Sequence, residues 1–269
     1  MLKDITLGQY FPGDSIVHRL DPRTKLIILI VYIVALFCAV SWVSYGIVFA
    51  FLAAAIAISK ISVKAIVRGM KPLILILVFT GVLNLFFTVG EGEPLVDIWI
   101  FTIYAEGIVR AFFMVIRILM LISGTFLLTY TTSPISLTDG LESLLNPLKA
   151  IRLPVHELSM MMCIAQRFIP TLIEETDKIM SAQKARGADF ESGSLLQRVK
   201  ALVPILVPLF ISAFRRADEL ATAMECRCYQ GGEGRTKMKL LRFTYYDFVS
   251  MIIGAVLIAA VLTLANFGL

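Results

Sequence analysis

The chain has 269 residues, of which 58% are hydrophobic, whereas soluble domains average about 45–50%. Its mean hydropathy is +0.83, and several runs without a charge approach the ~20 residues that cross a bilayer. These values exclude an ordinary soluble domain and predict an all-α integral membrane protein. The formal net charge of +5 is therefore expected to mark cytoplasmic loops rather than a nucleic-acid partner.

The reactive side chains give no sign of metal or catalytic chemistry. The 4 cysteines show no disulfide framework, and the 2 histidines cannot form a zinc site of the usual spacing. The stretch "GGEGRTK" (231–237) lacks the Gly-Lys-Ser/Thr ending of a phosphate loop, and no protease or esterase motif is present. We expect a protein that is not an enzyme and binds no metal, no cofactor and no ATP by itself.

The membrane spans are predicted from the charge-free runs. Residues 26–59 carry no charge, and a single helix of that length would measure about 51 Å, well over the ~30 Å hydrocarbon core. Two helices joined near "SWVSYG" (41–46) are favoured, because the flanking basic residues then share one side of the membrane. The predicted N-terminal membrane domain, residues 1–131, has four spans, at 26–42, 45–59, 72–89 and 108–130.

The loop charges predict the orientation of the chain. The loop after the third span, "GEGEPLVDIW" (90–99), is acidic and has no lysine or arginine, so it is expected outside. Residues 132–242 hold 15 of the 25 lysines and arginines, so 132–243 is expected to be a cytoplasmic helical module. Residues 244–269 form a fifth span. The prediction is a multi-pass protein of the cytoplasmic membrane, with its N-terminus in the cytoplasm and its C-terminus outside.

Two arginines interrupt the fourth span. Arg110 and Arg117 are seven residues apart and so lie on one helical face. We expect Arg110 to reach the outer interface and Arg117 to face a neighbouring helix or a partner, with an ion pathway as the alternative. No acidic residue or histidine accompanies them in the span, which argues against a proton relay.

The cytoplasmic module has the three- and four-residue apolar spacing of amphipathic helices. Helices are predicted over 137–150 and 155–187, the second with a bend allowed at Pro170. The apolar run 201–214 is short and is broken by Pro204 and Pro208. We expect a buried or interfacial helix there, against the membrane domain, with a sixth span as the alternative.

A weak internal repeat relates two helix ends. Arg186 and Arg227 are 41 residues apart, and "KARGADF" faces "ECRCYQG" in that alignment. One interpretation is ordinary capping, since basic side chains interact well with the C-terminal helix dipole. The other is docking, because small neighbours clear space for a guanidinium to enter a partner's groove and bind a carboxylate through two hydrogen bonds. The candidate docking residues are Ala185, Arg186, Gly187, Cys226, Arg227 and Cys228.

A further motif, "HRLDPRTKL" (18–26), precedes the first span. Asp21 suits the N-cap of a helix, and Pro22 suits its first position. Arg23 and Lys25 are expected to hold the start of this helix at the cytoplasmic interface. We interpret these four residues as a membrane-interface anchor without a chemical role.

Together these motifs resemble the transmembrane T component of energy-coupling-factor (ECF) ABC transporters. The resemblance rests on "HRLDPRTKL", "ARG" (185–187) and "MECRCYQGGEGRTKM" (224–238), and it covers nearly the whole chain. It implies an L-shaped helical fold whose two arginine-bearing coupling helices dock on two ABC-type ATPase subunits, the A components. A separate small membrane protein, the S component, would capture the substrate. Arg227 departs from the family pattern, since it lies between two cysteines and the next glycine is Gly231.

The resemblance implies the function of a coupling subunit. Such a subunit transmits ATP-driven motion to the S component during vitamin or metal uptake in a prokaryote. A stand-alone secondary transporter or channel is the alternative, and a non-transporting scaffold is a third possibility. A secondary transporter would have an ionisable midplane site or inverted repeats with broken helices, and the sequence offers only Arg110 and Arg117.

Overall fold

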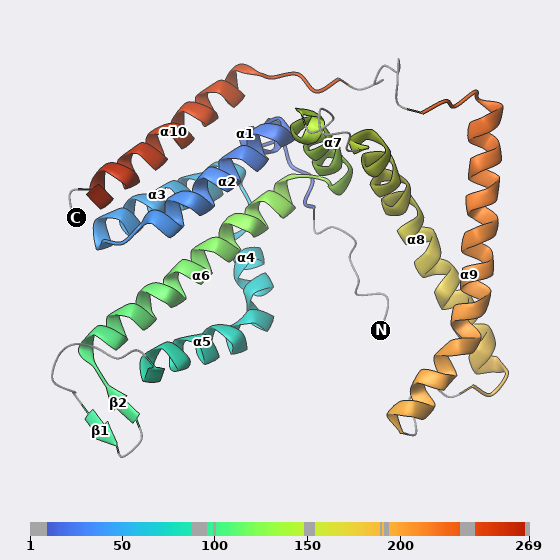
Figure 1. The fold of residues 1–269 in the computed structure, drawn as a ribbon, viewed down its shortest axis with the longest axis horizontal. Coiled ribbons are helices and arrows are strands. Elements are labelled where there is room, and N and C mark those ends of the chain that lie inside the picture. The colour runs from blue at the N-terminus through green and yellow to red at the C-terminus, as the bar shows by residue number, and fades with distance from the viewer. Residues whose placement is uncertain are drawn as a thin grey trace. The chain divides into compact units, whose positions relative to one another are not determined.

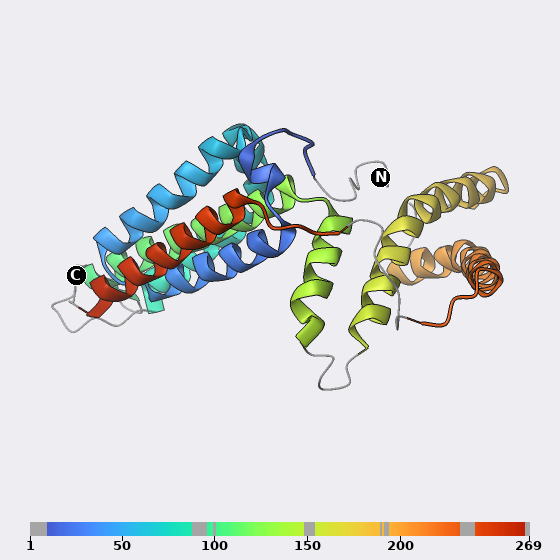
Figure 2. The same ribbon diagram turned by 90° about the horizontal axis from the view of Figure 1, so that it is seen from above.

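The computed structural model describes residues 10–87, 96–98, 101–147, 154–188, 190, 194–231 and 240–266. These residues are mostly helical, with one two-stranded hairpin (Figure 1, Figure 2). The chain divides into two compact units. We call Gly8–Leu141 with Leu241–Leu269 the bundle unit, and Glu142–Leu240 the insert unit.

The bundle unit contains most of the apolar helices. Its elements are α1 (Ile16–Arg19), α2 (Pro22–Cys38), α3 (Trp42–Ser59), α4 (Val63–Met70), the 3₁₀ helix η2 (Lys71–Leu73), α5 (Ile74–Phe87), β1 (Val96–Ile98), β2 (Phe101–Ile103), α6 (Ala105–Thr131), α7 (Pro134–Leu145) and α10 (Tyr245–Asn266). The strands β1 and β2 pair antiparallel, and α7 passes into the insert unit. Residues 88–89, 148–150 and 267–269, which the sequence placed in helices, lie outside the described residues.

Four helical stretches of the described chain are long and apolar enough to cross a membrane. They are Trp42–Ser59, Val63–Phe86, Glu106–Thr131 and Tyr245–Asn266. The helix α2 has 17 residues and is about 26 Å long, and it packs against α10, α6 and α3. The predicted all-α membrane fold class is confirmed. A count of five spans, with α2 as the first, stays a prediction.

The uncharged run forms two helices with a short turn between them. The first, α2, ends at Cys38, and α3 begins at Trp42. Ser41 caps α3, because its hydroxyl accepts a hydrogen bond from the Ser44 N–H at 3.3 Å. The turn therefore lies just ahead of "SWVSYG", where small polar residues satisfy the first N–H groups of α3.

The core of the bundle unit lies where α2 meets α3, α6 and α10. Small residues allow close helix packing there, since Ala35 and Ala39 of α2 have no exposed surface. The Tyr32 hydroxyl donates to the Met120 carbonyl at 2.9 Å, which joins α2 to α6. The buried core residues are Tyr32, Ala35, Leu36, Ala39, Tyr45, Val48, Leu52, Met120, Leu257 and Val261.

The helix α4 was not expected from the sequence. It is followed by η2, which contains Pro72, and by α5, and the chain changes direction between α4 and α5 (Figure 1). The predicted third span, 72–89, covers the end of η2 and α5, whereas the stretch long and apolar enough to cross a membrane begins earlier, at Val63.

The insert unit is built on two long helices that pack against each other. These are α8 (Val155–Ala185), with 31 residues, and α9 (Leu195–Cys226), with 32 residues. The expectation that Pro204 and Pro208 break the run 201–214 was wrong, because α9 continues through both prolines. The prolines are four residues apart, so the missing N–H groups lie on one face and the helix bends instead of ending (Figure 1).

The apolar part of α9 differs in burial from the expectation as well. Leu202, Val203, Leu206, Val207 and Phe210 are each between 46% and 60% exposed. Within the described residues, α9 is not among the helices apolar enough to cross a membrane. A sixth span at 201–214 is therefore not supported, burial does not hold within the insert unit, and an interfacial helix against the membrane domain stays a prediction.

Candidate docking site at two helix ends

The helix α8 ends at Arg186, which is its C-cap residue. The Gly187 N–H donates to the Lys184 carbonyl at 3.0 Å, and the Ala188 N–H donates to the Gln183 carbonyl at 3.0 Å. This pair of bonds is the Schellman motif, which requires a left-handed residue just after the cap. Gly187 fills that position with a φ of +88°, at little steric cost because it has no Cβ.

The helix α9 ends in the same way at Arg227. The Cys228 N–H donates to the Glu225 carbonyl at 2.8 Å, and the Tyr229 N–H donates to the Met224 carbonyl at 3.0 Å. The left-handed residue is Cys228 itself, with a φ of +55°. The sequence left this turn to Gly231, but Gly231 has its own positive φ three residues further on. The two ends therefore share one backbone geometry without sharing a glycine.

This geometry bears on the two interpretations of the arginines. Gly187 is the C′ residue that ordinary capping predicts, and at each end backbone N–H groups satisfy two of the last carbonyls without the arginine side chain. Arg186 and Arg227 are both exposed, and neither makes a hydrogen bond or ion pair through its side chain to the described residues. A Cβ placed on Gly187 would meet nothing within 4 Å. Space around the guanidinium groups is therefore open to a partner.

An ion pair joins α8 to α9 at equivalent positions of the repeat. Arg216 Nη2 lies 2.8 Å from Glu175 Oε2, and these residues are 41 apart, as are Arg186 and Arg227. A hydrogen bond from Ser212, followed by the charge of Arg216, lowers the pKa of Glu175 below its ordinary value. Each docking arginine lies 11 residues beyond its helix's ion-pair residue (186 − 175 = 227 − 216 = 11), about 16 Å along the axis. This pair was not predicted from the sequence, although the same 41-residue offset aligns the two opposite charges.

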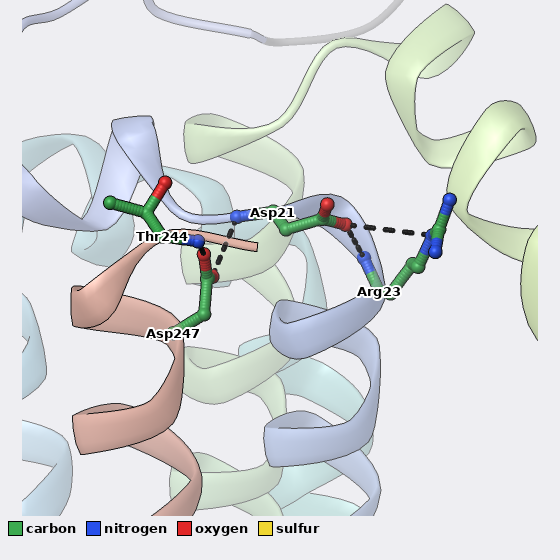
Figure 3. Close-up of polar contacts among 4 residues, drawn as sticks. All are labelled: Asp21, Arg23, Thr244 and Asp247. Atoms are coloured by element: carbon green, nitrogen blue, oxygen red, sulfur yellow. Dashed lines mark hydrogen bonds and ion pairs between the residues drawn. The ribbon is translucent and has the colours of Figure 1, made fainter. Parts of the chain in front are cut away.

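The anchor motif forms a polar cluster at one end of the bundle unit (Figure 3). Asp21 is the N-cap of α2, where its side chain accepts the Arg23 N–H at 2.9 Å, and Pro22 is the first helical residue. Asp247 accepts the Asp21 N–H at 2.9 Å and the Thr244 N–H at 2.7 Å. One carboxylate thus caps α2 and α10 together. Asp247 was missed, and its position in the first turn of the last helix was the available signal.

The two basic residues of the motif have different surroundings. Arg23 lies 3.9 Å from Asp21 and over the Phe243 ring, with 5.6 Å between the guanidinium carbon and the ring centroid. Lys25 is only 7% exposed, and its Nζ donates to the carbonyls of His18 and Thr131 and to the Thr132 hydroxyl. Lys25 therefore joins the start of α2 to the end of α6 instead of offering its charge to the membrane surface.

The arginines of α6 make contacts within the bundle unit. Arg117 donates to the Tyr45 hydroxyl at 2.8 Å and to the Ala39 carbonyl at 3.2 Å, so it faces neighbouring helices. Arg110 lies 3.7 Å from Glu106 one turn away, and both side chains are exposed. Arg117 ties the turn between α2 and α3 to α6, and an ion pathway is not needed to explain either residue.

Comparison with known proteins agrees with this geometry. Residues 13–238 match the family model described as CbiQ, cobalt transport protein. The proteins named energy-coupling factor transporter transmembrane protein EcfT include one from Clostridium kluyveri, 55% identical over 96% of this chain and 96% of its own length. That of Bacillus subtilis is 50% identical over 97% of this chain and 98% of its own length. That of Lactococcus lactis subsp. cremoris is 44% identical over 97% of each.

These matches span nearly all of the chain, including both arginine-bearing helix ends and the motif before α2. The several apolar helices agree with a multi-pass membrane protein. The chain therefore belongs to the CbiQ family of membrane transport proteins, as a transmembrane component of energy-coupling factor transporters.

Proposed function

We propose that this chain couples ATP hydrolysis by two ABC-type ATPase subunits to substrate uptake through a small membrane S component. The ATPase subunits hydrolyse the ATP, and the S component captures a vitamin or a metal ion. The observation that carries the proposal is the pair of matched helix ends at Arg186 and Arg227. Two equivalent ends suit two similar partners.

Each end is suited to enter a groove on an ATPase subunit. The guanidinium is exposed, and small residues flank it on both sides: Ala185, Gly187, Cys226 and Cys228. An arginine fork binds a carboxylate through two parallel hydrogen bonds, which fixes direction as well as affinity. A groove that closes with ATP can therefore pull the helix end with it.

The ion pair between Glu175 and Arg216 suits a fixed point between the two moving ends. We call residues 175–186 of α8 and 216–227 of α9 the two arms. Each docking arginine lies 11 residues from the ion pair (186 − 175 and 227 − 216), so equal movements of the ATPase subunits displace both helix ends by the same amount. The exposed apolar surface of α9, at 202–210, fits the membrane-embedded S component as its second partner. Motion at the arginines would then reach the S component through α8 and α9.

One end of the bundle unit is proposed to face the cytoplasm. The starts of α2 and α10 and the end of α6 meet at one end of the bundle unit, through Asp21, Asp247 and Lys25. The positive-inside rule makes that end cytoplasmic, with the N-terminus inside, the C-terminus outside and the insert in the cytoplasm. A prokaryotic cytoplasmic membrane belongs to the same proposal.

The test is co-purification and uptake with Arg186→Ala, Arg227→Ala and the double variant. Loss of a desolvated, paired arginine costs about 2–5 kcal/mol at such an interface, so each single variant should weaken ATPase docking and the double variant should lose the ATPase subunits from the purified complex. Arg→Lys at either position should also weaken docking, because lysine cannot form the fork. Arg215→Ala, an exposed arginine inside α9, is the matched control. Full assembly and uptake in the double variant would overturn the proposal, as would substrate transport by the isolated chain in liposomes.

A further inference from the structure

The helix α4 and its C-cap residue, Lys71, carry a row of cations on one face. Lys64, Arg68 and Lys71 follow one another at i, i+4 and i+7, which places them on the same side of a helix. All three are exposed, as is Lys60 just ahead of the helix. We call Lys64, Arg68 and Lys71 the basic row.

The opposite face of α4 is fixed against the bundle. Ile66 is 4% exposed, and α4 packs on α6. A Cβ on Gly69 would lie 2.8 Å from the Tyr130 hydroxyl and 2.9 Å from the Phe126 ring, so the glycine allows this close approach. The packing leaves the basic row directed away from α6.

Apolar side chains lie beside the basic row. Val63 is 61% exposed and Val67 is 53% exposed, and both fall between the cations and the packed face on the helical wheel. Along the chain, α4 follows the apolar helix α3 and is joined through η2 to the apolar helix α5. The candidate span Val63–Phe86 includes α4, but the chain changes direction between α4 and α5 (Figure 1). A short helix with adjacent cationic and apolar exposed faces is suited to lie in the plane of the membrane interface.

The basic row has no acidic partner on its own part of the chain. Residues 22–90 contain no aspartate or glutamate. Among the described residues, Lys64, Arg68 and Lys71 make no ion pair. Lys60 is set apart, because it lines a pocket together with Asp14. Three neighbouring positive charges are thus left to an external anion.

We propose that α4 binds the anionic headgroups of phospholipids, with Val63 and Val67 inserted at the boundary between headgroups and acyl chains. Basic residues at a bilayer surface are attracted to acidic lipids, and the attraction falls off within a Debye length. The bilayer beside α3 and α5 supplies such headgroups at high local density. This surface is separate from the docking arginines and does not depend on the proposed coupling role.

The test compares the full-length chain with Lys64→Gln/Arg68→Gln/Lys71→Gln. Purified protein in a mild detergent is offered equal amounts of phosphatidylglycerol and phosphatidylcholine, and retained lipids are counted by native mass spectrometry. The unaltered chain should retain phosphatidylglycerol in preference to phosphatidylcholine. The ratio of the two retained lipids should fall at least about tenfold in the triple variant. The variant Arg167→Gln/Lys200→Gln/Arg215→Gln makes the same charge change at exposed positions of α8 and α9 and should keep the preference.

Two further measurements keep the proposal open to refutation if the triple variant folds poorly. Raising the salt concentration should reduce the preference of the unaltered chain, because screening weakens surface charge interactions. Soluble glycerol 3-phosphate should not compete with phosphatidylglycerol, since it lacks the acyl chains that Val63 and Val67 are proposed to contact. Equal competition would indicate a free-phosphate site and overturn the proposal. An unchanged lipid preference in the triple variant would also overturn the proposal. This holds even if the triple variant loses a co-purifying protein.

Discussion

Cys228 holds a backbone conformation that normally favours glycine, with a φ of +55° at the end of α9. A left-handed conformation costs a residue with a Cβ about 1–2 kcal/mol, so Cys228→Gly should stabilise this helix end by up to about 1 kcal/mol. Amide hydrogen exchange of residues 224–229 measures the effect. Cys226→Gly is the control, because Cys226 is the last helical residue and glycine there should destabilise α9. Equal effects of the two substitutions would contradict the assigned geometry.

Asp247 is fully buried and accepts two backbone N–H groups, from Asp21 and Thr244. Asp247→Ala leaves both donors without a partner, at about 1–3 kcal/mol for each. We expect a clearly lower unfolding temperature in detergent, with the first loss of protection at the starts of α2 and α10. Asp218→Ala, at an exposed position of α9, should leave the temperature nearly unchanged. An unchanged temperature for Asp247→Ala would show that water replaces the carboxylate.

Sequence patterns predicted local residue roles better than distant contacts. The N-cap role of Asp21 and the first-turn role of Pro22 follow from their order along the chain, and both are observed. Asp247 caps the helix start 226 residues away, which no local pattern contains. A position of Lys25 at the cytoplasmic interface stays a prediction, but no local pattern showed the three acceptors inside the bundle unit that bind its ammonium group.

At the scale of elements, Glu175 and Arg216 connect the two long helices of the insert unit. Their side chains are 22% and 37% exposed, so the ion pair contributes only about 0.2–1 kcal/mol to stability. Arg216→Gln should therefore leave ATPase docking nearly intact but reduce uptake, because the two arms lose their fixed point. Arg215→Gln removes the same charge from the adjacent exposed position and should leave uptake unchanged. Loss of docking in Arg216→Gln would mean that the pair supports folding alone.

The carboxylate of Glu175 also predicts a dependence on pH, because a hydrogen bond from Ser212 and then the charge of Arg216 favour its charged form. The pKa of Glu175 is lowered in the folded chain, so its stabilising contribution is present above the ordinary value of 4.5 and is lost as the pH falls through the lowered pKa. The difference in unfolding free energy between the unaltered chain and Glu175→Gln should therefore be measurable at pH 7 and vanish in acid. Glu174→Gln, at the exposed neighbouring position, should show no such change. A difference that persists in acid would assign the effect to packing.

The sequence predicted where helices occur more reliably than it predicted whether a helix continues through its prolines. Apolar spacing predicted a helix over 155–187, and α8 spans Val155–Ala185. The prolines of α9 were interpreted as a break because each removes a backbone hydrogen bond, yet their four-residue spacing confines the loss to one face. The helix α4 was missed because its charges were assigned to a loop between spans. Its packing through Gly69 on Phe126 and Tyr130 depends on residues far along the chain.

At the scale of the whole molecule, the direction of the chain through the membrane can be tested with reporter fusions. Five alternating spans place residue 231 in the cytoplasm and residue 266 outside. Alkaline phosphatase, which is active only outside the cytoplasm, should be active when fused after residue 266 and inactive after residue 231. Green fluorescent protein should give the opposite pattern. Matching signals from both sites would remove α10 from the count of spans, and exchanged signals would contradict the orientation.

The two docking arginines should also behave as parts of one bivalent contact. If two ATPase subunits associate with each other, docking at one end holds the second subunit near the other end at high effective concentration. Arg186→Ala and Arg227→Ala should then each retain much of the ATPase pair, whereas the double variant should lose both subunits. Uptake should nevertheless fall strongly in each single variant, because both arms beyond the ion pair between Glu175 and Arg216 must move. Titration of each purified variant with ATPase subunits measures binding, and substrate uptake by the same variants measures coupling. Together the two measurements separate binding from coupling. A single variant that binds as weakly as the double one would show that the ends do not share one partner assembly, and one that transports normally would show that motion of a single end is enough.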